Sequence, residues 1–295
     1  MSLVEIHSIP SLRSPIALVA FGGWSDAGEA ATGVITHLLA TLAGNDGSET
    51  HTAELIAEID SEDFYDFQVN RPLIFVDDSM IRSLTWPGTQ VFGLRNPAGE
   101  RDFVVIRGVE PSMKWRTFAN ELLDLFEDLE VELVITLGSM LADTPHTRAI
   151  PVSGTGAHPE IAQRLGVEVS RYEGPTGILA VIQDGCVRRG IDAIALWAAI
   201  PHYANGTPSP KATLALLNGL EDFCEISLPQ GELPALSVHW EEAVNEMVKE
   251  DSDIEEYIKS LEESKDSAEL SDDSGEELAR EVERFLRRQN NSNES

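Results

Sequence analysis

Short apolar strands that alternate with amphipathic helices constrain the fold of this chain more than any other feature. Ile16–Phe21 is a brief apolar run that ends at Gly22-Gly23, and residues 31–42 then repeat apolar side chains at helical spacing. Leu133–Leu137 and Ile191–Ile200 are further buried-type runs, with helical patterns between them. Such alternation is typical of a parallel sheet covered by helices on both faces. We therefore predict a three-layer α/β/α sandwich with a mainly parallel sheet.

A β-hairpin interrupts this pattern. Thr89–Leu94 and Phe103–Arg107 flank Asn96-Pro97-Ala98-Gly99, a turn-forming sequence that predicts two antiparallel strands. Because a parallel sheet does not require a hairpin, we expect this one to be an insertion. The remaining patterns predict strands over Glu54–Ile59, Leu73–Val76 and Val167–Val169, and helices over 115–129, 159–165, Thr176–Arg189 and from Ser209-Pro210 onward.

The composition changes near residue 230. Residues 230–295 contain 20 acidic and 7 basic residues, and Pro229, Gly231 and Pro234 mark the boundary. Three apolar stripes at helical spacing follow, over 240–248, 254–261 and 278–286. We predict an α/β core domain over residues 1–229, an acidic C-terminal helical lid over 230–289, and a disordered tail over 290–295.

The net charge of the whole chain excludes several classes of function. There are 51 acidic and 21 basic residues, which gives a formal charge of −30. This balance argues against nucleic-acid binding and against docking on an anionic membrane, because both need clustered Lys and Arg. Two cysteines cannot form a disulfide framework, so we expect a cytoplasmic protein. We expect no signal peptide, and the apolar run at Ile194–Ile200 is too short to span a bilayer.

Candidate site residues follow the predicted strands. In an open parallel sheet, ligands bind beyond the carboxyl ends of the strands. Glycines in these turns let a ligand approach the backbone, and histidine and arginine side chains supply proton transfer and anion binding. We expect these turns to gather at one edge, with Asp26, His146 and Arg148 in a single cleft under the lid. The predicted ligand-binding residues are Gly22, Gly23, Trp24, Asp26, Gly28, Gly138, His146, Arg148, Gly174, Thr176 and His202.

Each of these residues also has a structural interpretation. Asp26 is a favoured helix cap, and Trp24 is a packing residue as well as a stacking platform. His146 and His202 each follow a proline, where a histidine bonded to the backbone is common. Arg148 either binds an anion or forms an ion pair with Asp143 or Glu173.

The sequence lacks the signature motifs of several specific kinds of chemistry. The turn after Ile16–Phe21 is neither a G-x-G-x-x-G nor a G-x-x-x-x-G-K sequence, so we predict no nucleotide cofactor. Ser139 lacks the G-x-S-x-G elbow of serine hydrolases. Cys186 is expected to be a buried small hydrophobe. The acidic run Glu58–Asp66 is interpreted as a solvated loop. We predict no metal site, because the possible ligands Asp143, His146, His158 and His202 match no standard spacing.

Six segments, in order, resemble the proteasome assembly chaperone 2 family, and most closely its actinobacterial branch. The resemblance covers roughly residues 10–222. It rests on Ala20–Gly28, Asp66–Pro72, Val109–Pro111 with Trp115-Arg116, Leu137-Gly138 with Pro145–Arg148, Gly174–Gly177 and Leu196–Ala212.

The resemblance implies properties that the residue patterns alone do not give. It implies a core similar to the nucleoside-phosphorylase-like fold, a hairpin insertion used for oligomerisation in a trimer, and a C-terminal helical part over a ligand cleft. Eukaryotic and archaeal relatives assist proteasome assembly, and some use a hydrophobic-Tyr-x tail. This chain departs from that pattern, since it ends Asn290–Ser295 without tyrosine.

Three functions are consistent with these features. The first is a protein-interaction or assembly-chaperone-like factor that forms a homo-oligomer. The alternative is a binding protein or hydrolase for a small molecule, nucleoside-like or another metabolite, that uses the predicted cleft. The third is a purely structural oligomer. The sequence identifies neither a substrate nor a partner, and it does not decide whether the protein is an enzyme.

Overall fold

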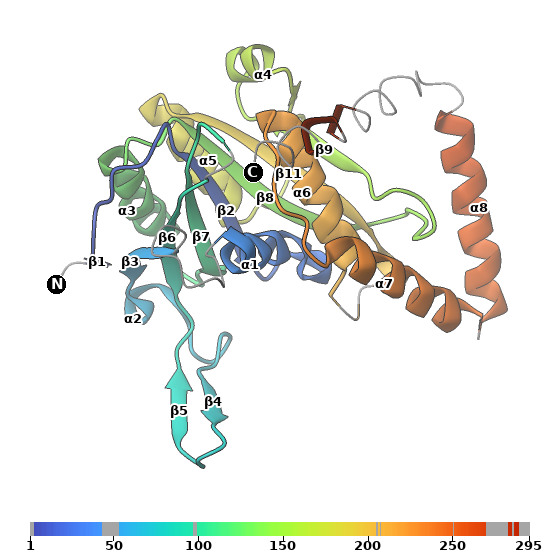
Figure 1. Cartoon of the computed structure of the whole chain (residues 1–295), viewed down its shortest axis with the longest axis horizontal. Coiled ribbons are helices and arrows are strands. Elements are labelled where there is room, and N and C mark those ends of the chain that lie inside the picture. Colours follow the sequence, from blue (N-terminus) through green and yellow to red (C-terminus); the bar gives the residue numbers. More distant parts are fainter. Residues whose placement is uncertain are drawn as a thin grey trace.

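A nine-stranded mixed sheet forms the centre of the molecule (Figure 1). The computed structural model describes residues 3–42, 53–96, 99–204, 206, 208–249, 251–269, 283–284 and 286–288. The strands follow one another across the sheet in the order β1 (Val4–Ile6), β3 (Glu54–Ile59), β6 (Thr89–Leu94), β7 (Phe103–Val109), β2 (Ile16–Gly22), β8 (Leu133–Ala142), β11 (Asp192–Pro201), β9 (Val152–Gly156) and β10 (Glu168–Val169).

The four middle strands, β7, β2, β8 and β11, are parallel. Ile16 at the start of β2 pairs with Phe103 on one side and with Leu133 on the other, so these strands begin level with one another. β6, β3 and β1 continue the sheet in antiparallel fashion beyond β7, and β9 is antiparallel to β11. The carboxyl ends of β3, β7, β2, β8 and β11 therefore lie on the same edge.

Helices cover both faces of the sheet, which confirms the predicted sandwich. Ile16 and Leu18 of β2 face α1 (Ala30–Leu42) and α6 (Pro210–Cys224) in one apolar core. Ala17 and Val19 face the opposite core, with α3 (Trp115–Asp128) and α5 (Ile178–Arg189). Within this second core Phe118 packs edge-on against Phe21 and Phe64. The short helices are α2 (Ser61–Phe64) and α4 (Pro159–Leu165), with 3₁₀ turns at Ala27–Glu29 and His202–Ala204.

Local sequence signals explain where several helices begin and end. Ser209 caps α6 by accepting the Ala212 N–H at 3.3 Å, and Pro210 occupies the first turn. Gly166 and Gly190 end α4 and α5 in the left-handed conformation. These boundaries match the sequence predictions.

The projecting hairpin is a different segment from the predicted one. β6 and β7 do form a hairpin, but both strands belong to the main sheet because β7 pairs in parallel with β2. The insertion is instead formed by β4 (Leu73–Val76) and β5 (Arg82–Thr85), which pair only with each other and extend away from the body (Figure 1). Leu73–Val76 was predicted as a strand, whereas its partner Arg82–Thr85 was not.

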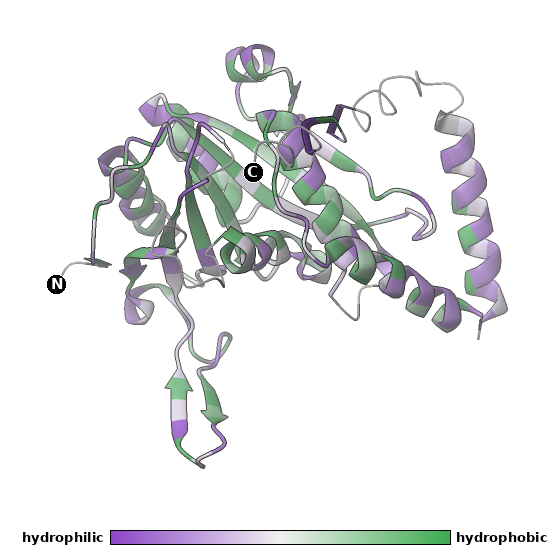
Figure 2. Ribbon diagram, in the orientation of Figure 1, coloured by the Kyte–Doolittle hydropathy of each residue, from purple (hydrophilic) through white to green (hydrophobic). Residues whose placement is uncertain are grey.

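Two of the three predicted C-terminal helices lie in the described part of the chain. α7 (Leu233–Val248) packs on α6, and its Trp240, Val244 and Val248 are buried together with Ile258 of α8 (Ser252–Glu269). Most of the rest of α8 is hydrophilic (Figure 2). The third stripe lies largely outside the described residues, and the predicted tail over 290–295 lies wholly outside them.

Asp251 caps the start of α8, because its carboxylate accepts the N–H groups of Asp253 and Ile254, at 3.0 and 3.4 Å. Among the described helices, none is long and apolar enough to cross a membrane.

Candidate functional site

The turn after β2 connects the strand ends at the carboxyl edge of the sheet. The Ser139 N–H donates to the carbonyl oxygen of Ser25 at 2.9 Å, and the Ser139 hydroxyl donates to that of Ala27 at 2.8 Å. The Ser209 N–H donates to the Gly28 carbonyl oxygen at 2.7 Å. The residue 22–28 turn is thus fixed to β8 and to the start of α6. Both polar groups of Ser139 are therefore used to hold this turn, which is a structural role.

Asp26 anchors the beginning of α1. One carboxylate oxygen accepts the N–H groups of Ala31 and Thr32, at 2.9 and 3.1 Å, and the other accepts the Thr32 hydroxyl. The side chain is buried, and this burial raises the pKa of the carboxyl group. Asp26 is therefore a helix cap, as its structural interpretation predicted, but one that also borders open space.

Gly28 is required by the geometry of this turn. It has a φ of +58°, and a Cβ atom there would lie 3.1 Å from Ile200 Cδ1. The next residue, Glu29, also has a left-handed φ of +49°, which is unusual for a residue other than glycine. Glu29 is therefore the strained position of this turn, since glycine adopts a left-handed φ freely, and such strain concentrates at functional turns.

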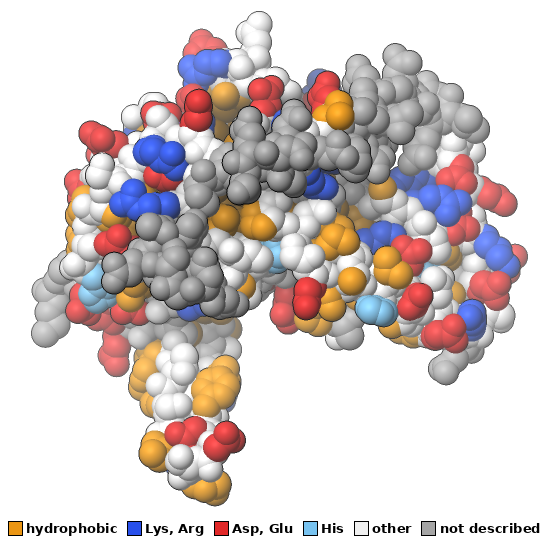
Figure 3. Space-filling view, viewed as in Figure 1, with side chains coloured by type: hydrophobic (Ala, Val, Ile, Leu, Met, Phe, Trp, Pro, Cys, Tyr) orange, Lys and Arg blue, Asp and Glu red, His pale blue; other side chains and the backbone are white. Residues whose placement is uncertain are grey.

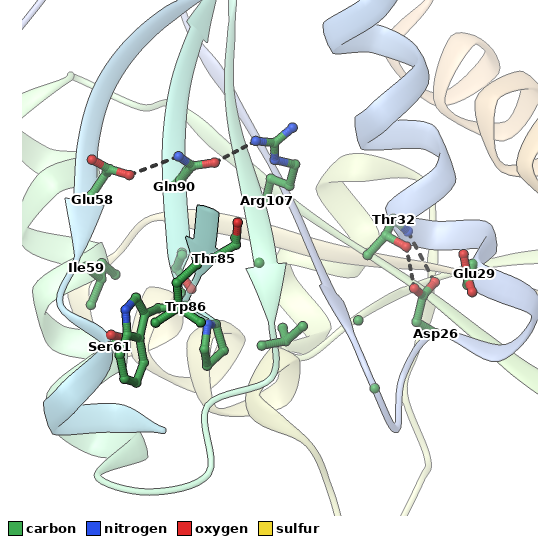
Figure 4. Close-up of a pocket in the computed structure, with 18 residues that line it drawn as sticks. Asp26, Glu29, Thr32, Glu58, Ile59, Ser61, Thr85, Trp86, Gln90 and Arg107 are labelled. Atoms are coloured by element: carbon green, nitrogen blue, oxygen red, sulfur yellow. Dashed lines mark hydrogen bonds between the residues drawn. The ribbon is translucent and has the colours of Figure 1, made fainter. Parts of the chain in front are cut away.

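A large hollow opens beside this turn (Figure 4). Its volume is about 860 Å³. Three of the predicted site residues line it, Gly22, Gly23 and Asp26, together with residues that the sequence analysis did not select: Glu29, Thr32, Glu58, Ile59, Ser61, Leu84, Thr85, Trp86, Pro87, Gly88, Thr89, Gln90, Arg107, Gly108 and Val109.

A row of polar side chains crosses three strands in this hollow. Gln90 donates to Glu58 Oε1 at 2.9 Å and accepts from Arg107 Nη2 at 2.6 Å (Figure 4). These residues lie opposite one another on β3, β6 and β7. Glu58 belongs to β3, as the strand predicted over Glu54–Ile59 requires, whereas the interpretation of the rest of the acidic run as a solvated loop is wrong because Ser61–Phe64 form α2. Glu58, Gln90 and Arg107 are polar positions within three strands that the sequence predicted, and this was the signal from which the row could have been predicted.

A smaller hollow of about 340 Å³ lies on the other side of the same turn. It is lined by Ala27, Gly28, Leu141, Gly206 and Pro208, and it shares Asp26 and Glu29 with the large hollow. The two acidic residues therefore form part of the wall between two open spaces.

The predicted residues before α5 form a separate group. The carboxylate of Glu110, at the end of β7, accepts the Ile178 N–H at 2.8 Å and so caps α5. A Cβ atom on Gly177 would lie 2.7 Å from that carboxylate, so glycine permits the contact. Gly174 and Thr176 are exposed in this segment, and Trp24 is 63% exposed nearby. Glu110 was not predicted as a site residue.

His146 is buried beneath α7. The Tyr203 hydroxyl lies 2.9 Å from Nδ1 and accepts the His146 backbone N–H at 2.8 Å. Nε2 lies 3.1 Å from the Asn245 side-chain oxygen, an acceptor. These partners define a neutral ring that accepts the Tyr203 proton at Nδ1 and donates from Nε2. Burial lowers the pKa of His146 and raises that of Tyr203 to about 12.

Polar contacts attach α8 to the turn after β8. Arg148 binds both carboxylate oxygens of Asp266, at 2.8 and 2.9 Å, and Thr147 donates to Glu262. Tyr257 donates to Asp143 Oδ1 at 2.9 Å. Arg148 therefore forms an ion pair, which is one of its two predicted roles, but with Asp266 rather than with Asp143 or Glu173. The Arg148 guanidinium lowers the pKa of Asp266 in return.

The structure divides the predicted site into separate groups. Neither hollow described above is lined by His146, Arg148 or His202. Gly138 lies against the ring of Trp197, and His202 Nδ1 is 3.3 Å from Asp143 Oδ1. His158 accepts the Glu160 N–H at the start of α4.

The described residues offer neither a metal-binding cluster nor a reactive thiol at Cys186. No set of three or more His, Cys, Asp or Glu residues within the described ranges could hold a metal ion. Cys186 is buried in α5, which raises the pKa of its thiol to about 12 and suits a packing role.

Comparison with known proteins identifies relatives over most of the chain. The model of the PAC2 family matches residues 20–248. A PAC2 family protein from Streptomyces avermitilis is 45% identical, with a TM-score of 0.74 over 82% of this chain and 99% of that one. A Mycobacterium tuberculosis proteasome-assembly chaperone homologue is also 45% identical, with a TM-score of 0.72 over 83% and 99%. A search of curated proteins gives no match.

A more distant structure shares the fold alone. It is an archaeal proteasome activator from Pyrococcus furiosus, 16% identical, with a TM-score of 0.64 over 83% of this chain and 97% of that one.

Removing the Arg148 charge should loosen α8. We expect Arg148→Gln to lose the two-pronged pair with Asp266 and so to raise the population in which α8 is detached, by roughly two- to fivefold. Glutamyl-endopeptidase cleavage within residues 252–269 measures this. The control is Arg188→Gln, which removes an exposed ion pair within α5. Equal cleavage rates in both variants and the wild type would contradict the assignment.

Acid should destabilise the protein through His146. Because the folded-state pKa is lowered, the neutral ring stabilises the fold above its ordinary pKa of about 6.5, and this contribution is lost as the pH falls below that value. We expect the fall in urea midpoint between pH 7.5 and 5.5 to be smaller in His146→Gln. His239→Gln, on the exposed side of α7, should keep the wild-type fall. Identical pH dependence in the two variants would refute the role given to His146.

Proposed function

Because the chain belongs to the PAC2 (proteasome assembly chaperone 2) family, as its motifs predicted, we propose that it is an assembly-chaperone-like protein that acts through protein–protein contacts and forms a homo-oligomer. The observation that carries this proposal is the β4–β5 hairpin. Its apolar side chains lie in water, and Figure 3 shows hydrophobic atoms along the projecting segment with acidic atoms near its tip. Exposed apolar patches of this kind mark interaction surfaces.

Both faces of the hairpin are apolar. Side chains alternate along a strand, so Leu73 and Phe75 lie on one face and Ile74 and Val76 on the other. Ile74 is 59% exposed and Phe75 is 53% exposed, so neither face is covered within one chain. A two-stranded hairpin is at best marginally stable in water without a packing partner.

This two-sided pattern favours a ring of copies over a simple pair. A flat partner covers one face only, whereas two neighbouring subunits cover both. A cyclic homo-oligomer meets this requirement, and a trimer, as the family resemblance implies, is the smallest ring that does so. The hairpin would then be buried at the centre of the assembly or between its subunits.

The relatives support a role in assembly. The Mycobacterium tuberculosis protein, 45% identical, is a proteasome-assembly chaperone homologue. The chain's high negative charge would accelerate association with a basic surface on a client protein. We place the protein in the cytoplasm, where the free thiols of Cys186 and Cys224 stay reduced.

A small-molecule-binding role is the second candidate. The hollow beside Asp26 favours it, since its volume of about 860 Å³ falls within the roughly 300–1,000 Å³ of small-molecule sites. The group around His146 and Arg148 does not favour it, because these residues already contact α7 and α8.

Replacing apolar side chains of the β4–β5 hairpin with glutamate should dissociate the oligomer. We expect the double substitution Ile74→Glu with Phe75→Glu to change the solution mass from three chains to one, because one charge would be buried on each apolar face. Light scattering after size-exclusion chromatography measures the mass. Val238→Glu, at an exposed apolar position of α7, is the matched control. A wild-type mass in the double variant, or a monomeric wild type, would rule out the hairpin as the contact.

The assembly role itself is tested by reconstitution. Separately purified actinobacterial proteasome α and β subunits are mixed with and without this protein, and core-particle formation is followed on native gels. We expect formation to accelerate several-fold with the wild type and less with the hairpin variant. Unchanged kinetics with the wild type would argue against a chaperone role while leaving the oligomer measurement valid.

A further inference from the structure

Two arginines near the C-terminus bind one carboxylate of α6. Arg284 forms an ion pair with Asp222, and Arg287 donates to Asp222 Oδ1 at 3.2 Å. The side chains of Arg284 and Asp222 are each 19% exposed, so most of this contact lies away from water. Burial raises the pKa of Asp222, although the charges of both arginines act in the opposite direction. Charged groups that lose much of their hydration in this way gain little net stability from pairing.

A third arginine joins the two ends of the acidic tail on the same helix. Arg288 pairs with Glu221, whose side chain is 2% exposed, and donates to the Asn218 side-chain oxygen at 2.9 Å. The same two acceptors hold the segment that leads into α7. Glu221 accepts the Leu228 N–H at 2.9 Å, and Asn218 accepts from the Gln230 side chain at 2.8 Å. Because α7 and α8 lie between these contacts in the sequence, the tail starts and ends at one place on α6.

The two sets of contacting side chains have matching spacing. The acceptor face of α6 consists of Asn218, Glu221 and Asp222, which lie at i, i+3 and i+4. The arginine face has the same spacing and consists of Arg284, Arg287 and Arg288. The described residues 283–284 and 286–288 are helical, so the three arginines lie on one side of a helical segment. Two helical surfaces with complementary charges therefore meet in register.

Charge, more than apolar packing, makes this contact. Leu286, which lies between the arginines in the sequence, is 51% exposed. Arg287 Nε is buried without a hydrogen-bond partner among the described residues, and such a group opposes the gain from the ion pairs. The acceptor face does not depend on the arginines for its position, because Leu216, Leu217 and Leu220 anchor α6 in the core. The acceptor face would therefore stay formed if the arginines left it.

We propose that the arginine face is an exchangeable latch: it leaves the acceptor face, and a helix of a partner protein with arginines at the same spacing takes its place. In the closed state the chain occupies its own partner site and holds the end of the tail against α6. The net charge of −30 attracts such a basic partner. The inference rests on the proposed role in protein–protein contacts and adds the chemistry of the segment that is bound.

Binding of a labelled synthetic peptide to the full chain tests the latch. The peptide has the sequence of residues 277–290, and fluorescence anisotropy measures its affinity at about 0.15 M salt, which suppresses long-range attraction. We expect the triple variant Arg284→Gln, Arg287→Gln, Arg288→Gln to bind this peptide at least about tenfold more tightly than the wild type, because the wild-type acceptor face is already occupied. Arg284→Gln alone, which leaves two arginines in place, should give an intermediate affinity.

Two carboxylate variants show where the peptide binds. In the triple variant, the added substitution Asp222→Asn should weaken peptide binding about tenfold, because a charge-assisted contact is lost. Asp128→Asn, at an exposed position of α3, removes the same charge elsewhere and should leave the affinity unchanged. A peptide of the same composition in scrambled order keeps its charge but loses the spacing, and it should bind more weakly.

Several outcomes would overturn the proposal. Absence of peptide binding to the triple variant would do so, as would equal affinity for the wild type and the triple variant. Equal binding of the scrambled peptide, or equal effects of Asp222→Asn and Asp128→Asn, would indicate non-specific attraction to an acidic protein. Light scattering on the triple variant keeps this proposal apart from the oligomer. An unchanged mass with peptide binding absent would refute the latch alone, and a reduced mass would place the arginine face on a second copy and contradict a latch within one chain.

Discussion

Four neighbouring strands that run in the same direction determine where every candidate group in this protein lies. β7, β2, β8 and β11 are hydrogen-bonded in parallel, so the segments that follow them emerge at one edge of the sheet. β3 ends at the same edge because two antiparallel steps separate it from β7. Reversal of β2 alone would move Asp26 to the opposite edge. The backbone ladder, more than any side chain, thus defines the candidate site.

This edge is divided into a covered half and an open half. Beyond β8 and β11, the acidic helices α7 and α8 lie against the turn that contains His146 and Arg148. Two basic side chains there, Arg148 and Lys211, pair with carboxylates of α8 and α7. Beyond β2, β7 and β3, neither α7 nor α8 lines the hollow beside Asp26, which stays open with Ser61 of the short helix α2 on its wall. The contrast explains why two residues predicted for one site have different surroundings: His146 is hydrogen-bonded to Tyr203 and Asn245 beneath α7, whereas Asp26 borders the open hollow.

The sequence predicted elements whose signals are local. Apolar runs located β2, β8 and β11, and Ser209-Pro210 and Gly190 marked helix ends, because propensity and capping act within a few residues. Elements that depend on distant pairing were missed: β9 has the unremarkable sequence Val-Ser-Gly-Thr-Gly and is a strand because β11 lies beside it. The same reason explains the misplaced insertion, since only the pairing of β7 with β2 shows which hairpin belongs to the sheet. For the site, Gly22, Gly23 and Asp26 were found, whereas Glu58, Arg107 and the contact of His146 with Asn245 depend on folding.

Hydrogen exchange on the full chain at low and high salt tests most directly whether ion pairs hold α8 against the turn after β8. At about 0.05 M NaCl the account predicts slow exchange in residues 144–148, in α7 and in α8. At about 1 M NaCl, where the screening length falls to roughly 3 Å, exchange should accelerate in α8 and much less in α7, whose Trp240 and Val244 are buried, with β8 and β11 unchanged. Rapid exchange in α8 at low salt, or equal acceleration in α7 and α8, would contradict it.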